Sequence, residues 1–208
     1  FIYVGTACSF PKHLQNGINS VLNEEMLFPA IPESSYGWSK LIGTLEMSYA
    51  FQNSKIDYCT LLLHNVYGKY CDFDEKSSQV IPSLISKTLK LTNNNKLEIW
   101  GNGEQSRSFI HAEDVAKAIS SYLEKKSLIP DIIQIGPQKG TTIKDLAEII
   151  LSLENKNNLL IYDESKPTGD FGRSCDCKLA KKYLNWEPEI ELEEGLRDLY
   201  FWIKSEIK

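Results

Sequence analysis

No apolar stretch in this sequence is long enough to cross a membrane. A spanning helix needs about 20 consecutive apolar residues, and every apolar run here is interrupted well before that length. No positively charged and then apolar leader precedes Phe1, so we expect neither a membrane anchor nor a secretory signal. These absences predict a cytoplasmic protein without a membrane partner.

The sequence also lacks an excess of basic residues. Its 23 lysines and arginines stand against 28 aspartates and glutamates, which gives a net charge of -5. Surfaces that bind nucleic acid are usually basic, because they neutralise phosphates. We therefore predict no nucleic-acid partner. A small anionic ligand fits this composition only if a few basic side chains gather at one place.

Paired cysteines are missing as well. The five cysteines are an odd number without paired spacing, which favours a reducing compartment over a disulfide framework. Cys175 and Cys177 lie close together, but no second Cys or His pair lies near them. A structural zinc site needs four ligands. We therefore predict no metal site.

The pattern that the chain does contain is the alternation of a parallel α/β sheet. Residues 1–4 and 57–66 read as buried strands, and apolar residues at helical spacing predict a helix over 34–52 between them. Strand, helix, strand is the unit of such a sheet. Residues 11–32 read as a loop. Further strands are predicted at 97–100, 132–135 and 159–162, and further helices at 78–91, 112–125, 142–153 and 193–207.

Tyr36 and Lys40 stand four residues apart on the first of these helices. Side chains at i and i+4 share one face of a helix, so the Lys40 ammonium can favour the ionised form of Tyr36. An ionised phenol can act as a base. The spacing alone also occurs on solvated helix faces, so other motifs must support this interpretation.

Several further segments match one family in order. They are residues 5–11 (GTACSFP), 64–68 (HNVYG), 100–111 (WGNGEQSRSFIH), 172–176, 185–188 and 194–196. With the Tyr-x-x-x-Lys helix they resemble the C-terminal two-thirds of extended short-chain dehydrogenases/reductases of the NAD-dependent nucleotide-sugar epimerase/dehydratase family. Within that family the segments are most similar to the GDP-mannose 3,5-epimerase group and next to GDP-L-fucose synthases. Residues 100–111 resemble a nucleotide-contacting hairpin of the family.

The resemblance implies an α/β fold with a partial Rossmann-type doubly wound parallel sheet and a smaller mixed α/β substrate-binding domain. Residues 1–68 would form the C-terminal part of a truncated NAD-binding domain. Residues 69–208 would be mainly substrate-binding, with 107–136 packing back on the Rossmann part. The family's Gly-x-x-Gly-x-x-Gly turn is missing, so we expect a piece of a longer enzyme that is inactive alone. A homodimer through the helix of Tyr36 is also expected.

The resemblance further implies NAD beside the sugar, with NADP as the alternative, and hydride removed from C4 and later returned. Tyr36 would be the base, Lys40 would hold the nicotinamide ribose, and Thr6 would bind the same sugar oxygen. Cys8 matches the epimerase cysteine, whose thiolate removes a proton next to the C4 ketone. The second acid/base falls on Asp74, where the family has Lys or His, and the nearby Lys69, Asp72 and Lys76 are the alternatives to it. This departure puts 3,5-epimerisation in more doubt than the redox step.

The substrate contacts implied by the resemblance are Asn65, Val80, Arg107 and Arg173. The two guanidinium groups can meet a diphosphate with paired hydrogen bonds. We expect three tryptophans to anchor the core rather than to stack on a base: Trp100, Trp186 and Trp202.

The predicted function is an NAD-dependent nucleotide-sugar epimerase of the GDP-mannose 3,5-epimerase type, with a GDP-hexose as the favoured substrate. The alternatives among enzymes are a fucose-synthase-type epimerase-reductase and a 4-epimerase. A 4,6-dehydratase fits less well, because that group carries Asp-Glu where this chain has Ala7 and Cys8. From another class, the chain could be a sugar-nucleotide-binding module without turnover.

Overall fold

Three parallel strands form the sheet of the N-terminal part of the chain. β3 (Cys59–Leu63) lies between β1 (Ile2–Thr6) and β8 (Ile132–Ile135). The register pairs Thr6 with Leu63 and Leu63 with Ile135, so the three strands end at one edge. Ligands of open α/β sheets bind outside this carboxyl edge. The computed structural model describes residues 1–207 apart from 93, 126–128, 157–158 and 167–170.

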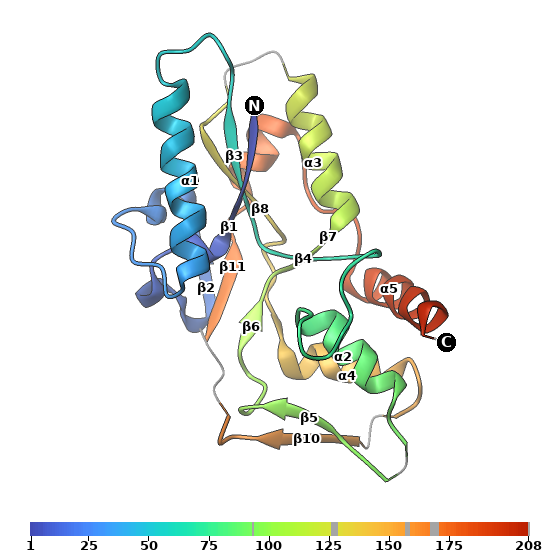
Figure 1. Cartoon of the computed structure of the whole chain (residues 1–208). Helices are drawn as coiled ribbons and strands as arrows, with labels where there is room; N and C mark the ends of the chain where they lie inside the picture. Colours follow the sequence, from blue (N-terminus) through green and yellow to red (C-terminus); the bar gives the residue numbers. More distant parts are fainter. Residues whose placement is uncertain (93, 126–128, 157–158, 167–170, 208) are drawn as a thin grey trace.

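Helices cover both faces of this sheet (Figure 1). Successive strand residues point to opposite faces, and accordingly Leu61 and Leu62 belong to different apolar clusters. Leu62 packs with Leu41 of α1 (Ser35–Phe51), and Leu61 packs with residues of α3 (Ala112–Glu124). This arrangement of helix, parallel sheet and helix confirms the predicted α/β fold class. The division into domains at residue 68 stays a prediction.

The predicted strand over 57–66 is wrong at its end, because the chain changes sheets at His64. The His64 amide donates to Ile135 O at 3.0 Å, whereas the next amide, that of Asn65, donates to Ser108 O at 3.1 Å. β4 (Asn65–Tyr67) then pairs with β7 (Phe109–His111). The switch leaves Asn65 at the carboxyl edge of the first sheet.

The predicted loop over 11–32 is also wrong, because it contains β2 (Asn16–Leu22). β2 belongs to a second sheet, whose strand order is β2, β11 (Gly172–Cys175), β6 (Ser106–Arg107) and β9 (Thr141–Thr142). Three short 3-10 helices flank β2: η1 (Ala7–Ser9), η2 (Lys12–Gln15) and η3 (Glu24–Leu27). The partner of β2 lies some 150 residues further along the chain, so no local pattern announces the pairing.

The remaining helices form a third apolar cluster with the lower strands of Figure 1. These helices are α2 (Val80–Leu89), α4 (Ile143–Ser152) and α5 (Leu192–Glu206). The short π-helix η5 (Ala180–Leu184) packs instead with the cluster of Leu61. β5 (Leu97–Trp100) pairs in parallel with β10 (Leu160–Asp163), not with β6. The predicted hairpin over 100–111 is therefore wrong. Positive φ angles of 74° at Gly101 and 78° at Gly103 turn the chain away from β5.

The three tryptophans do not share one role. Trp186 is 4% exposed, and its Nε1 donates to Asp114 O at 2.9 Å. Trp202 is partly buried against the third cluster. Trp100 is 51% exposed, so its prediction as a core anchor is wrong. It lies on the side of β5 that alternation directs away from the core.

Candidate functional site

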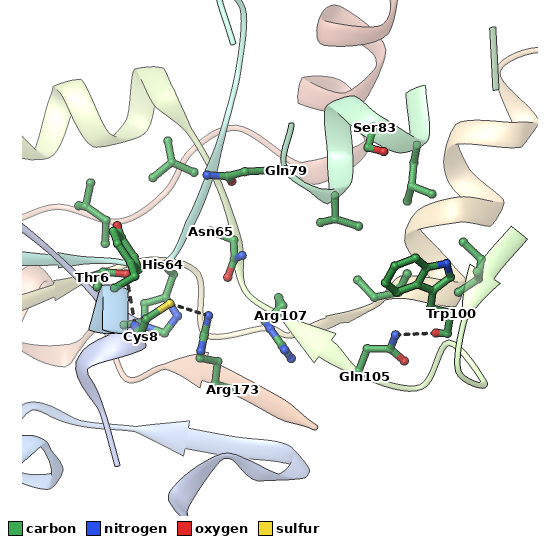
Figure 2. A pocket seen from close by; sticks show the side chains of 18 of the residues that line it. Thr6, Cys8, His64, Asn65, Gln79, Ser83, Trp100, Gln105, Arg107 and Arg173 are labelled. Carbon is green, nitrogen blue, oxygen red and sulfur yellow. Dashed lines mark hydrogen bonds between the residues drawn. The ribbon is translucent and has the colours of Figure 1, made fainter. Parts of the chain in front are cut away.

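A cavity of about 650 Å³ opens at the carboxyl edge of the first sheet, between that sheet and α2. Its wall contains eight of the predicted site residues: Thr6, Cys8, Tyr36, Lys40, Asn65, Val80, Arg107 and Arg173. Figure 2 shows Thr6 and Cys8 at one end, Asn65 and the two arginines in the middle, and Trp100 at the other end. Residues far apart in the sequence therefore meet in one elongated site.

The first turn of α1 is fixed against Cys8. The Ser34 hydroxyl caps this helix by accepting from the Gly37 amide at 3.1 Å, and Ser9 Oγ donates to Gly37 O at 3.3 Å. A Cβ on Gly37 would lie 3.1 Å from the carbonyl carbon of Cys8 and would overlap its oxygen. Only glycine allows this approach, which holds Tyr36 at the cavity beside Cys8.

Hydrogen bonds fix the two ends of the predicted catalytic group. Thr6 Oγ1 accepts from the Cys8 amide at 3.2 Å and so starts the short helix η1. Lys40 Nζ donates to Val4 O at 3.0 Å, and it lies 5.4 Å from the centroid of the Tyr3 ring. The half-exposed Tyr36 lines the same cavity.

Arg173 brings a buried positive charge to the sulfur of Cys8. The arginine is 6% exposed, and its Nη2 donates to Cys8 Sγ at 3.3 Å (Figure 2). Its Nη1 donates to Gln15 Oε1 at 2.7 Å, and Gln15 Nε2 in turn donates to Phe10 O at 3.1 Å. The guanidinium therefore has a fixed position, with its charge directed to the cavity end that holds Cys8.

His64 also lines the cavity, although we did not predict it as a site residue. Gln134 Nε2 donates to Leu22 O at 2.7 Å, so Gln134 Oε1 is the atom that faces His64 Nε2 at 3.0 Å. An amide oxygen can only accept, so His64 Nε2 carries the hydrogen and Nδ1 presents a lone pair. Burial, together with the charge of Arg173, lowers the pKa of His64 to about 4 against the opposing bond to Gln134. The imidazole is therefore neutral at pH 7. Its place before Asn65 in the HNVYG motif is the signal that could have identified it.

Asp74 is the one predicted site residue outside the cavity wall. It is exposed, and its Oδ1 accepts from the Lys76 amide at 2.9 Å. The wall at the start of α2 contains Glu75 and Gln79 instead. Glu75 Oε1 accepts from Lys90 Nζ at 2.7 Å. Turns between β4 and α2 direct Asp74 outward, which counting along the sequence from Asn65 could not foresee.

The described ranges contain no group of three or more His, Cys, Asp and Glu side chains arranged to hold a metal ion. In the same ranges, no helix has the length and apolar character needed to cross a membrane. His111 Nδ1 accepts from the Glu113 amide at 3.3 Å and so caps α3.

The chain is similar to curated nucleotide-sugar enzymes over its whole length. It is 31% identical over 208 residues to GDP-mannose 3,5-epimerase 1 of Oryza sativa subsp. indica. This alignment covers 100% of this chain and 54% of that protein. It is also 31% identical over 199 residues to GDP-L-colitose synthase of Yersinia pseudotuberculosis, and that alignment covers 93% of this chain and 63% of the relative. The chain thus spans between half and two-thirds of the length of these relatives.

Solved structures have the same fold and a comparable partial overlap. UDP-N-acetylglucosamine 4-epimerase from Methanobrevibacter ruminantium M1 superposes with a TM-score of 0.84 at 26% identity, over 99% of this chain and 63% of that one. UDP-glucuronic acid 4-epimerase from Bacillus cereus, solved with UDP-glucuronic acid and NAD, superposes with a TM-score of 0.83 at 25% identity. The match covers 99% of this chain and 61% of that one. The model of one family matches residues 1–136. The chain therefore belongs to the NAD dependent epimerase/dehydratase family.

Proposed function

We propose that the protein containing this chain is an NAD-dependent nucleotide-sugar epimerase that works through a transient 4-keto sugar. The observation that supports this most is the meeting of Thr6 and Cys8 at one end of a cavity whose middle carries two arginines. Tyr36 lines the same cavity, and the next residue, Gly37, packs against the Cys8 carbonyl. The curated relatives act on GDP-sugars by their names, which favours a GDP-hexose as the substrate. The arginines Arg107 and Arg173 would meet its diphosphate.

The donor groups at this end fit a nicotinamide ribose. Lys40 has three N–H donors, and Val4 O uses one of them, so two remain for ribose hydroxyls beside β1. Bound NAD would supply the hydride acceptor and donor. Tyr36 would take the proton of the C4 hydroxyl as hydride leaves C4, and Thr6 Oγ1 would bind the same oxygen. NADP is the alternative cofactor.

Cys8 would perform the step that distinguishes an epimerase from a simple oxidoreductase. A C4 ketone acidifies the neighbouring C–H groups at C3 and C5, and a thiolate near them can remove one proton. Arg173, whose Nη2 donates to Cys8 Sγ, would hold the sulfur toward the sugar. Delivery of a proton to the opposite face by a second acid would then invert the centre.

A second candidate function is 4-epimerisation, and the wall opposite Cys8 favours it. Gln79 lines this wall, and its amide neither takes nor gives a proton. The neighbouring Glu75 is paired with Lys90, and Asp74 points elsewhere. Inversion at C4 needs only the redox group and no second acid/base. It would appear as C4 inversion without uptake of solvent hydrogen.

The test is hydrogen exchange in deuterated water with the full-length protein, NAD and GDP-mannose. A 3,5-epimerase incorporates deuterium at C3 or C5. We expect Cys8→Ser to lose this exchange while C4 oxidation is retained, and Cys71→Ser, at a free cysteine outside the cavity wall, to keep both. Unchanged exchange in Cys8→Ser would remove Cys8 from the mechanism. Absence of exchange with every GDP-hexose would exclude the 3,5 reaction, and nucleotide-sugar binding without bound NAD would favour a binding module.

We also propose a homodimer through α1. This helix leaves Trp38, Ile42 and Tyr49 exposed on its outer side, and contiguous exposed apolar residues often mark a protein–protein interface. Sedimentation of the full-length protein measures its state. A Tyr49→Glu variant is expected to shift the dimer toward the monomer.

A further inference from the structure

Gln15 is a buried amide that the proposed chemistry does not use. It is 1% exposed, and within the described part of the chain it is not among the side chains that line the cavity. A buried amide destabilises a fold unless its polar atoms are hydrogen-bonded. The partners of Gln15 therefore indicate what it does.

Backbone carbonyls set the orientation of this amide. Gln15 Nε2 donates to Phe10 O at 3.1 Å and, more weakly, to Pro11 O at 3.5 Å. A carbonyl oxygen can only accept, so the amide nitrogen must face these two atoms and Oε1 must face away from them. There Gln15 Oε1 accepts from Arg173 Nη1 at 2.7 Å. The amide thus joins the segment that follows Cys8 to the guanidinium that contacts Cys8.

The backbone pairing is irregular at Arg173. β11 pairs with β2, but the register of this pairing shifts between Gly172 and Ser174. Irregularities of this kind redirect a side chain and are frequent next to active sites. On this side of β11 the backbone ladder does not hold Arg173 in line with β2, so its side-chain contacts help to set where the guanidinium lies.

We propose that Gln15 is a positioning residue that acts on Cys8 through Arg173. The inference rests on the proposed function, because that function gives Cys8 its role. Nη1 and Nη2 of Arg173 belong to one planar group. Fixing Nη1 at Gln15 therefore also fixes the direction of Nη2, which donates to Cys8 Sγ at 3.3 Å. Sulfur is a weak acceptor, so the bond to Gln15 is the stronger of these two.

The position of this charge affects the reactivity of Cys8. The thiolate is the form that removes a proton or attacks an electrophile, and a neighbouring guanidinium stabilises it. Arg173 is 6% exposed, so solvent and salt screen its charge little. Removal of Gln15 would take away one of the bonds that hold the guanidinium beside the sulfur. The step at Cys8 would then become slower, although Gln15 itself contacts no substrate.

Alkylation of Cys8 by iodoacetamide in the full-length protein tests this role without turnover. Mass spectrometry of the peptide that contains Cys8 measures the rate. Gln15→Met keeps most of the buried volume and removes the amide, and we expect a rate lower by about tenfold at neutral pH. Arg173→Met should lower the rate by a similar or larger factor. In the double variant, Gln15→Met should add nothing to the loss from Arg173→Met, because Gln15 acts through Arg173.

Turnover gives a second readout, and a neighbouring residue gives the control. In deuterated water Gln15→Met should slow hydrogen exchange at C3 or C5 about as much as it slows alkylation, while C4 oxidation is retained. Asn16→Ala is the matched control, because Asn16 is exposed and its Nδ2 donates only weakly, to His13 O at 3.4 Å. Both rates should stay at the wild-type level in this variant.

Two results would overturn the positioning role and leave the proposed function standing. One is an unchanged alkylation rate in a folded Gln15→Met protein, and the other is a pair of losses that multiply in the double variant. Gln15→Leu removes the same amide with a different shape and decides the question if Gln15→Met does not fold. Conversely, absence of exchange with every GDP-hexose, with the alkylation rates as expected, would overturn the 3,5 chemistry and leave the link from Gln15 to Cys8 intact.

Discussion

Replacing Gly37 with alanine tests whether the close approach of α1 to Cys8 positions the catalytic group. The added Cβ would lie 3.0 Å from Pro32 Cβ and 3.1 Å from the Cys8 carbonyl carbon, and it would overlap the Cys8 oxygen. Ordinary contacts between such atoms are about 3.5–4.0 Å. The obstacle is backbone, so α1 must move by roughly 1 Å to remove the overlap. This shift carries Tyr36 away from Thr6.

The expected cost has two parts. Overpacking of this kind destabilises a protein by about 1–3 kcal/mol, and the better helix propensity of alanine returns at most about 1 kcal/mol. We therefore expect Gly37→Ala to lower the free energy of unfolding by about 1–2 kcal/mol. A displacement of roughly 1 Å in a catalytic group can reduce turnover about 100-fold. The loss of activity should thus exceed the share of protein that has unfolded.

Gly43→Ala is the matched control in the same helix. There the added Cβ would meet the hydroxyl end of the Tyr3 side chain, which can rotate aside, so stability and turnover should stay close to wild type. Urea unfolding and the deuterium-exchange assay on both variants measure the two effects. If Gly37→Ala retains wild-type stability and exchange, the contact between α1 and Cys8 does not position Tyr36, and the reasoning fails.

Variants at two buried residues, His64 and Asp114, test other parts of the same structure. Burial lowers the pKa of His64 from its ordinary 6.5 to about 4. Between pH 6.5 and pH 4 the unfolded chain therefore binds a proton at His64 that the folded chain does not bind. The free energy of unfolding should fall by about 3 kcal/mol as the pH falls to 4. Urea titrations should show a flatter pH dependence in His64→Gln, and an equal slope would contradict the assignment. Asp114 is buried and its Oδ2 accepts from the amides of Glu189 and Ile190 at 3.1 and 3.0 Å, so Asp114→Ala should cost about 2–4 kcal/mol and Asp114→Asn clearly less. Equal losses in these two variants would show that the carboxylate oxygen is not what matters.

Local sequence patterns were sufficient for the elements that carry their own signals. The apolar spacing around Leu41 and the Ser34 cap specify α1, and the buried run at Leu61 and Leu62 specifies β3. The resemblance to the family implied that Tyr36 and Cys8 would share one site, and α1 does begin at the edge where β1 ends. The positions of these side chains follow from parallel α/β geometry. Their catalytic roles stay predictions.

The parts that sequence reasoning missed depend on distant partners. β2 is a strand because β11 supplies its hydrogen bonds, and its own residues carry little strand pattern. The change of sheet at His64 depends on Ser108 and Ile135, which accept from successive amides. Asp74 was placed by counting, whereas the turns before α2 decide which side chain reaches the cavity. Trp100 was assigned by residue type, whereas strand alternation left it outside.

The link between Arg173 and Cys8 has a consequence for how the protein is made. The two residues are 165 positions apart, and Gln15 and Arg173 are 158 apart. At typical synthesis rates, roughly 8 to 30 s pass between the addition of Cys8 and that of Arg173. During that time α1 and the first sheet can form, but β2 has no partner and the sulfur has no guanidinium beside it. The two ends of this contact therefore impose a late, slow step on folding, and the emerging chain exposes an unpaired β2 until β11 (Gly172–Cys175) has left the ribosome.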